Sequence, residues 1–584
     1  MPYKQKLPAG SACENNRDSG DFLTEARTSF WIRHSWLKWI ASGLLLLLLA
    51  LAVAVSIALR RAEPFLRARI VAALERHFHA RVELDSFHMS FKKGIQAEGR
   101  GLRIWPPEQV EGVPVSPSSG EPLIRLDEFR FHAPLQFKPA QPIHISMVEL
   151  RGLAVHLPPR SQFLHSTSAP KDAINEAAAL VSFSVDKIDC RSANLVLETS
   201  KAGKLPVAVA IADFQLTGSE GGTISAASPM NFTADLTSPK PVGNVRSAGM
   251  IGPWDVRDPG ESPIQGSYTF DHADLASFKG IAGILTSTGK YQGTLRDLTV
   301  DGDTDAPDFR LTHFGNSLPL HTHFHAIVDA TNGDTQLDPV DATLGHSHFT
   351  CTGQVVRVPD PDAPADHPTS KGHDIALNVN VDAGRIEDFL HLASHGPTQL
   401  LTGALTMKTA LHIPPGTDPV HQRLTLKGVF NLDQARFTST KIQDGITQLS
   451  LRGQGLPKEI KTTDPSTIHS AMLGSFQMAN GVVTLPSLTY TVSGADIELK
   501  GTYAVEGGAL NFAGTARLRA TISKVVGGVL GILLKPADRY FKKDGAGTEI
   551  PIHISGTRED PKFGIDFGRM RKKSPLEQVP ATDQ

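Results

Sequence analysis

Residues 375–381 read Ile-Ala-Leu-Asn-Val-Asn-Val, so apolar side chains at Ile375, Leu377, Val379 and Val381 alternate with small or polar ones. This period of two is typical of a β-strand with one apolar face. The alternation recurs along the chain, at 181–185, 207–211, 424–426, 497–499, 550–554 and 563–567. The sequence therefore predicts a mainly β body built from many antiparallel strands.

Composition supports this prediction. The chain has 584 residues with 51 glycines and 40 prolines, which suits frequent turns better than long helices. Loops are expected at 114–122, 253–263 and 359–368, and short helices at 171–181, 385–393 and 521–541. The formal net charge of −2 offers no excess of positive charge for nucleic acid. Cys13, Cys190 and Cys351 lie too far apart for a zinc motif, and a Cys190–Cys351 bridge would be incidental.

The segment 40–59 contains no charged residue, and about 20 helical residues cross the ~30 Å hydrocarbon layer of a bilayer. Trp31, Trp36 and Trp39 precede the segment and Arg60 follows it, as interfacial anchors do. We expect a single-pass membrane helix. The alternative is a cleaved signal peptide with Ala52-Val53-Ala54 as the cleavage site, but the apolar run is long for one.

Flanking charges leave the orientation of this helix open. Residues 20–39 carry three positive side chains and residues 60–79 carry five, which favours a cytoplasmic C-terminal side. Long domains, however, translocate largely regardless of flanking charge. After the span, apolar residues at 66, 70, 74 and 78 predict a short amphipathic helix that begins at Pro64.

Two stretches of the β body resemble one another. Leu275, Phe278, Gly293 and Leu295 match Ile386, Phe389, Gly403 and Leu405 at offsets of 110 or 111 residues. In each, a strand ending in aspartate leads into a short helix and then into a strand that begins at glycine. The pattern predicts repeats of about 110 residues, at 268–380 and 381–500, and repetition favours stacking in a line.

Motifs for chemistry are few. Residues 283–290 have one residue too many between the glycines for a P-loop. Asp301, Asp303 and Asp305 have calcium-loop spacing, but Ala306 replaces the turn glycine, so a solvated turn is expected. His321, His323 and His325 would share one face of a strand, with His346 and His348 nearby, and are weak candidates for a metal site; a polar solvent face is the simpler interpretation. No cofactor is expected.

The order of a leader, one membrane helix, an amphipathic helix and then strands resembles the AsmA family, relatives of TamB and of the bridge-like lipid transfer proteins. The segments that carry the resemblance are 87–101, 124–157 with Ile145, Val148 and Gly152, and 501–518 with the end from Ile550 through Gly556 to Phe563. The long Trp-bearing leader and the flanking charges depart from the family pattern. The resemblance implies a mainly β fold: an N-terminal transmembrane helix followed by an elongated, curved antiparallel β-groove of repeated units with a few short helices.

The domains expected are a polar, disordered leader (1–35), the transmembrane helix (36–61), the amphipathic helix (62–80), the β-groove (81–567) and a disordered tail (568–584). The resemblance also implies an anchor in the inner membrane of a diderm bacterium with the body in the periplasm. Such a protein carries phospholipids toward the outer membrane without catalysis, and an outer-membrane or envelope partner is expected at the C-terminal end.

Apolar members of the alternating runs are the predicted lining of the lipid groove: Phe183, Val209, Phe232, Leu377, Val379, Leu405, Leu426 and Leu499. A one-residue register error would turn any of them outward. Two other functions stay open on the sequence. One is a non-enzymatic assembly or scaffold factor that binds outer-membrane proteins through sheet edges. The other is a membrane-anchored enzyme acting on envelope polymers, for which no carboxylate pair is distinguished by spacing.

Overall fold

The structure is a computed structural model. It describes residues 47, 49, 50, 64, 67, 68, 70–72, 74, 75, 80–90, 95–105, 122–133, 143–157, 183–199, 201–225, 227–255, 258–364, 368–394, 399–461, 464–526, 533, 535–541, 547–558 and 560–565. The chain divides into two units, 1–69 and 70–584, and the sheet belongs to the second.

Helical residues are all that the structure describes before residue 80. In the first unit these include Leu47, Leu49 and Pro64, and in the second Ile70 and Leu74. No helix among the described residues combines the length and apolar character needed to cross a membrane. Most of the predicted span 40–59, and the predicted helix 171–181, lie outside the described residues.

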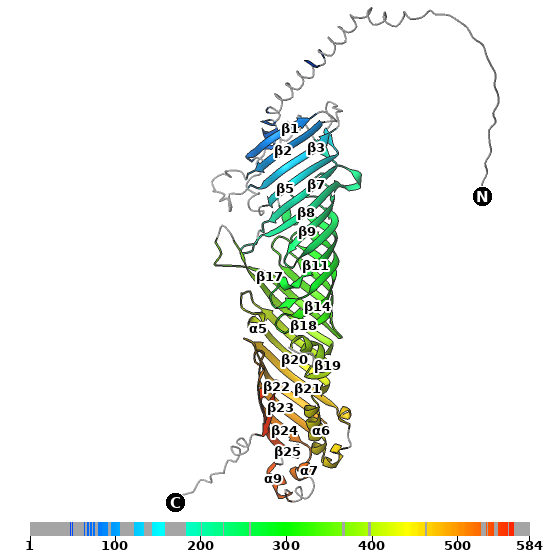
Figure 1. The fold of residues 1–584 in the computed structure, drawn as a ribbon, viewed down its shortest axis with the longest axis vertical. Helices are drawn as coiled ribbons and strands as arrows, with labels where there is room; N and C mark the ends of the chain where they lie inside the picture. The colour runs from blue at the N-terminus through cyan, green and yellow to red at the C-terminus, as the bar shows by residue number, and fades with distance from the viewer. Residues whose placement is uncertain are drawn as a thin grey trace, which may run out of the picture. The chain divides into compact units, whose positions relative to one another are not determined.

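The second unit is mainly β, as predicted, and its strands form a curled, half-barrel sheet (Figure 1). The first half of the sheet contains β1 (Val82–Ser90), β2 (Ile95–Ile104), β3 (Ile124–Ala133), β5 (Met147–Leu157), β7 (Lys187–Leu197), β8 (Val207–Gly218), β9 (Met230–Pro239), β10 (Val242–Ile251), β11 (Pro263–Asp274), β12 (Ile281–Ala282), β13 (Ile284–Thr294) and β14 (Leu298–Leu311).

The second half contains β15 (Ser317–Val328), β16 (Thr335–Leu344), β17 (Ser347–Pro359), β18 (Ser370–Arg385), β19 (Leu401–Ile413), β20 (Thr425–Phe437), β21 (Ser470–Ala479), β22 (Val482–Val492), β23 (Ala495–Ala504), β24 (Ala509–Leu518), β25 (Thr548–Thr557) and β26 (Pro561–Ile565). A separate two-stranded parallel sheet joins β4 (Ile143–Ile145) and β6 (Phe183–Val185).

Strand order follows chain order through the sheet. From β13 to β26 every strand pairs antiparallel with the next one in the chain. Before β13 the order is β1, β2, β3, β5, β7, β8, β9, β10, β11, and only the β5–β7 joint in this described part is parallel. Antiparallel neighbours need only short connections, which is why frequent Gly and Pro turns accompany the strands.

Helices lie in the connections between strands. They are α4 (Ile386–Leu392), α5 (Val420–Arg423), α6 (Thr440–Gln454), α7 (Ile522–Val526) and α9 (Asp538–Phe541), with 3₁₀ turns η1 (Ser219–Gly221), η2 (Pro259–Glu261), η3 (Leu275–Ser277), η4 (Pro457–Lys461), η5 (Pro465–Thr467) and η6 (Lys535–Ala537). Helix α4 falls within the predicted stretch 385–393. The predicted helix 521–541 contains α7, η6 and α9 instead of one described continuous helix. Helix α6 is absent from the sequence prediction.

Two sequence expectations need correction. Asp301, Asp303 and Asp305 lie in strand β14, not in a solvated turn. Gly403 is near the start of β19, as predicted, but its proposed equivalent Gly293 is near the end of β13. The two copies of the suggested repeat therefore place matched glycines at opposite ends of their strands. The features they do share are the turns η3 and α4, each of which follows a long strand.

A cluster of buried apolar residues lies in the C-terminal part of the sheet. Leu405, Leu432, Tyr490, Val492 and Leu518 are buried there, and Phe389 of α4, Ile446 and Leu449 of α6 and Val525 of α7 pack against them. A smaller cluster of Ala80, Val82 and Ile104 lies at the N-terminal end, where the helical residues Val71 and Leu74 cover it. Helices thus supply the apolar partners that the terminal strands need for burial.

Candidate functional site: the apolar face of the sheet

One face of the curled sheet is apolar across neighbouring strands. Directly paired residues of antiparallel strands project their side chains from the same face. Leu377 pairs with Leu411, Leu411 with Leu426, and Leu426 with Met478, which carries one apolar row from β18 to β21. A second row runs through Val381, Met407 and Phe430. The register therefore places apolar side chains of successive strands side by side.

The same face continues to both ends of the sheet. Leu488 pairs with Leu499, and Phe512 with Ile554. Toward the N-terminus the face contains Phe324, Phe270, Phe232, Phe214, Leu150, Phe129 and Phe87, connected strand by strand through pairing partners. These residues place one mainly apolar face along the register of the sheet.

Burial differs between the two faces. On β18 the side chain of Val381 is 1% exposed, whereas its neighbour Asp382 on the opposite face is exposed. On β15 Phe324 is half-buried, while the side chain of His323 beside it is 62% exposed. The apolar face therefore lies inside the curl, and the polar face meets solvent.

Seven of the eight residues predicted to line the groove lie on this apolar face: Val209, Phe232, Leu377, Val379, Leu405, Leu426 and Leu499. Their exposure differs. Val209, Leu377, Val379, Leu426 and Leu499 are half-buried, but Phe232 is 8% and Leu405 2% exposed. Leu405 is part of the core cluster under α4 and α6, so protein already covers it. Phe183 belongs to β6 in the small parallel sheet, and its side chain lies outside the described part of the chain.

Histidines and aspartates alternate on the opposite, solvent-facing side. His321, His323 and His325 of β15 each pair with one aspartate of β14, at Nδ1–Oδ1 distances of 2.8, 2.9 and 2.7 Å. His348 pairs in the same way with Asp382, and its hydrogen bond lowers the pKa of that carboxyl group. Each imidazole thus has its own carboxylate partner across the strands. No group of three or more metal-ligating side chains is found in the described residues.

Burial disfavours ionisation of both described cysteines. Cys190 and Cys351 are free and buried on the apolar face. Burial, with smaller contributions from Asp189 and Asp213, raises the pKa of Cys190 to about 11. Burial also raises the pKa of Cys351. The nucleophilic thiolate form is therefore rare at neutral pH.

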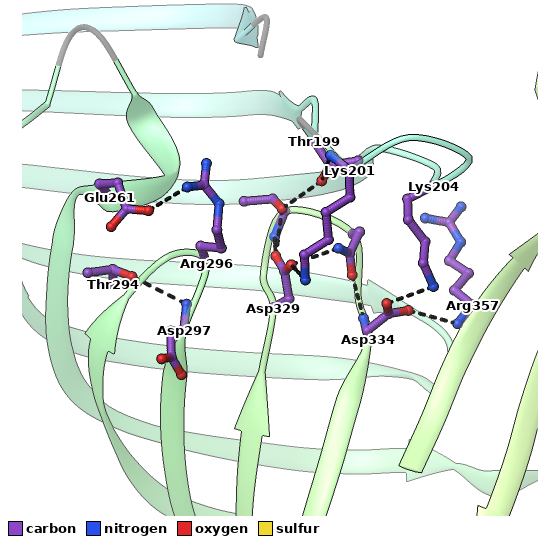
Figure 2. A network of polar contacts seen from close by, with 12 residues as sticks. Thr199, Lys201, Lys204, Glu261, Thr294, Arg296, Asp297, Asp329, Asp334 and Arg357 are labelled. Atoms are coloured by element: carbon purple, nitrogen blue, oxygen red, sulfur yellow. Dashed lines mark hydrogen bonds and ion pairs between the residues drawn. The ribbon is translucent and has the colours of Figure 1, made fainter. Parts of the chain in front are cut away.

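The sheet winds far enough that its two rims meet. The first rim holds the connections after β7, β9, β11 and β14, and the second holds those after β15, β17 and β19. Figure 2 shows Lys201 and Lys204, from the connection after β7, pointing toward Asp329 and Asp334 after β15. The Lys201 Nζ–Asp329 Oδ2 distance is 2.8 Å and the Lys204 Nζ–Asp334 Oδ2 distance is 2.7 Å. We call the line of contact between these rims the seam.

The seam continues beyond these ion pairs. Arg357 of β17 donates from Nη1 to the carbonyl oxygen of Pro206 at 2.8 Å. Further along, Lys279 donates to the carbonyl oxygen of Thr417 at 3.1 Å, and the rings of His313 and His421 lie 4.8 Å apart. Sequence analysis missed the seam because its partners are far apart in the chain and follow no motif.

Carboxylates in the seam are held by several donors. Asp329 is buried and accepts hydrogen bonds from the amide and hydroxyl groups of Thr331 and from the side chain of Asn332. Burial alone would raise the pKa of Asp329, but the hydrogen bonds from Lys201 and Thr331 outweigh it and lower the pKa. Asp334 accepts from the backbone amide of Arg357 at 3.1 Å. These contacts make the seam a built interface rather than a chance approach of two loops.

No family model, curated protein or solved structure matches the chain. The assignment of function therefore rests on the geometry of the apolar face and the seam.

Proposed function

We propose that this protein is a membrane-anchored carrier that moves phospholipids along the apolar face of its curled sheet, between the inner and outer membranes of a diderm cell. The mainly apolar face that extends from β1 to β26 carries the proposal. The uncharged segment 40–59 supports an inner-membrane anchor, and the AsmA-like order of segments supports a periplasmic body.

Physical chemistry favours acyl chains as the ligand. Each methylene group removed from water stabilises the bound lipid by about 0.8 kcal/mol, and the surface inside the curl is apolar over most of its register. Half-buried side chains such as Leu377, Val379 and Leu499 still have apolar area to cover. A chain sliding along such a face exchanges one apolar contact for another, so the movement needs no catalytic residue.

Site-specific photocrosslinking in the full-length chain tests the proposal. Benzoylphenylalanine would replace Val379 on the apolar face and, as the matched control, Asn378 on the opposite face of the same strand. We expect phospholipid adducts, identified by mass spectrometry, at position 379 and not at 378. Equal adducts at both positions, or none at 379 in protein that retains its circular dichroism spectrum, would reject lipid transport.

A second candidate function is an assembly factor for envelope proteins. The last described strand, β26, leaves Phe563 65% and Ile565 45% exposed, and strand edges with apolar side chains are sites where another chain adds a strand. The same crosslinker at Phe563 distinguishes this function, because a polypeptide adduct that shifts the band on a gel is expected only if the edge binds protein.

A further inference from the structure

A band of hydroxyl groups interrupts the apolar face in the wound part of the sheet. The band consists of Ser247, Tyr268, Ser287, Tyr291, Thr304 and Thr322, and strand pairing places all six on the same face as Phe232 and Phe324. These residues come from β10, β11, β13, β14 and β15. They lie within the stretch of strands whose rims meet at the seam.

Glycines make room for the two tyrosine rings. A Cβ atom on Gly266 would lie 2.6 Å from the hydroxyl oxygen of Tyr291, and one on Gly302 would lie 2.7 Å from that of Tyr268. The rings therefore extend along the sheet over glycines of neighbouring strands instead of projecting across the interior.

The hydrogen bonds within the band determine which of its atoms can still donate to a ligand or accept from one. Ser247 donates to the carbonyl oxygen of Ser267 at 3.1 Å, because a carbonyl can only accept. The 2.6 Å contact between Ser247 and Tyr291 must then use the Tyr291 proton. Likewise Ser287 donates to the carbonyl oxygen of Asp303, so Tyr268 donates to Ser287 at 3.0 Å.

Both phenol oxygens are thereby left as acceptors with no proton to give. A ligand group that donates hydrogen bonds fits them, whereas a bare phosphate oxygen does not. The faces of aromatic rings also attract cations, most strongly where water is excluded. The two tyrosines together suit an ammonium group.

The seam determines where the lipid headgroup must travel, inside the curl or in water. An open groove lets a lipid headgroup stay in water while its acyl chains slide along the apolar face. Where the rims are in contact through Lys201–Asp329 and Lys204–Asp334, that open side is closed. A lipid that passes this section must bring its headgroup inside, where an unpartnered polar group costs several kcal/mol.

We propose that the section between β7 and β20 is a closed passage that takes the whole phospholipid inside, and that the hydroxyl band receives an ammonium headgroup there. This inference rests on the proposed function and adds to it a preferred class of lipid. It predicts that the seam stays shut while lipid passes.

A disulfide lock across the seam tests the closed passage. The hydroxyl oxygens of Thr199 and Thr331 lie 3.2 Å apart, so cysteines at both positions place two sulfur atoms in reach of a bond with little movement. Full-length Thr199→Cys, Thr331→Cys protein would carry benzoylphenylalanine at Phe131, before the seam, or at Leu499, beyond it. The same sample under oxidising and reducing conditions provides the control.

We expect phospholipid adducts at both positions, unchanged when the lock is closed. Adducts lost on one side of the seam and kept on the other would show that the seam must open, and would overturn the closed passage. Failure of the two cysteines to join would show that the rims are not in contact and would overturn it as well. No adduct at either position in the reduced protein would instead reject the proposed function itself.

Lipid preference tests the hydroxyl band. The full-length chain would be reconstituted in vesicles of equimolar phosphatidylethanolamine and phosphatidylglycerol, with benzoylphenylalanine at Phe324. We expect the ammonium lipid to dominate the adducts, and Tyr268→Phe with Tyr291→Phe to reduce its excess about fivefold, the effect of losing a net hydrogen bond. Tyr503→Phe, on the same face outside the band, is the matched control. An adduct ratio near the vesicle composition, or one that the double variant leaves unchanged, would overturn the preference.

Discussion

Lys201 and Asp329 join two rims of one sheet: the Nζ of Lys201 lies 2.8 Å from Oδ2 of a carboxylate that is 6% exposed. Eight sheet strands and their turns separate the two residues in the chain. Winding of the sheet, rather than pairing of strands, brings them together. This contact is one of several that join the two rims at the seam.

Removing the charge of Asp329 is expected to loosen the seam. Asp329→Asn keeps the size of the side chain but weakens the hydrogen bonds with Lys201 and Thr331, at a cost of about 1–2 kcal/mol, since Lys201 is half-exposed. Hydrogen exchange followed by mass spectrometry should show faster exchange in peptides covering 199–206 and 329–334. Asp303→Asn, whose carboxylate is 73% exposed, should leave both peptides unchanged. Equal protection in both variants would contradict this account.

The seam should also weaken in acid. The pKa of Asp329 is lowered in the folded state, so this carboxylate contributes stability that is complete above its ordinary value near 3.8. That contribution is lost as the pH falls through the lowered folded pKa. Exchange rates for 329–334 measured from pH 6 downward should converge in the parent protein and Asp329→Asn only below pH ~4. Convergence already near neutral pH would argue against an ionised Asp329.

A charge on the apolar face should block lipid passage. Val379→Asp places a carboxylate where an acyl chain would slide, and an unpaired charge in an apolar setting costs several kcal/mol. Phospholipid adducts at a second position such as Leu499 should disappear. Asn378→Asp adds the same charge on the opposite face and should change nothing. Persistent adducts in a folded Val379→Asp protein would remove that residue from the lining.

Truncation inside the core cluster should destabilise the C-terminal part of the sheet. Leu432 is 1% exposed, and Leu432→Ala is expected to cost about 2–5 kcal/mol. Leu426→Ala, on the same face of the same strand but half-buried, should cost less. Urea denaturation followed by circular dichroism compares the two, and equal losses would place Leu432 outside the core.

Cys190 should resist alkylation while the protein is folded. With a pKa of about 11, only about one thiol in a thousand is ionised at pH 8. Labelling with N-ethylmaleimide, read at the peptide level by mass spectrometry, should be slow in buffer and fast in urea. Rapid labelling of Cys190 in the folded protein, with Cys190→Ser as the control for peptide assignment, would contradict its burial.

Local patterns predicted the strands well, because alternation such as Ile375 to Val381 depends only on which face of a strand is buried. Helix α6 escaped prediction because Gly445 and Gly453 weaken its helical pattern and Leu449 and Leu451 alternate as residues of a strand do. Its place follows from packing against β20 and β23, which the sequence alone does not show.

The sequence could predict on which face of the sheet a residue lies, but not how deeply its side chain is buried. Alternation put Leu377, Leu405 and Leu499 on the apolar face, but it could not show that helices cover Leu405 and leave the other two partly open. The hydroxyl band was missed for a related reason. Single Ser, Thr and Tyr residues in a strand carry no signal until the register brings them together.

Because nearly every strand pairs with the one made just before it, the sheet can assemble in the order in which the chain is synthesised, without waiting for distant segments. The seam, in contrast, joins segments that are made at different times. Lys201 leaves the ribosome long before Asp329, so the first rim lacks these partners until β15 to β17 have been made. Nascent chains stalled just before and just after residue 334 would thus differ in shape although they share almost every strand.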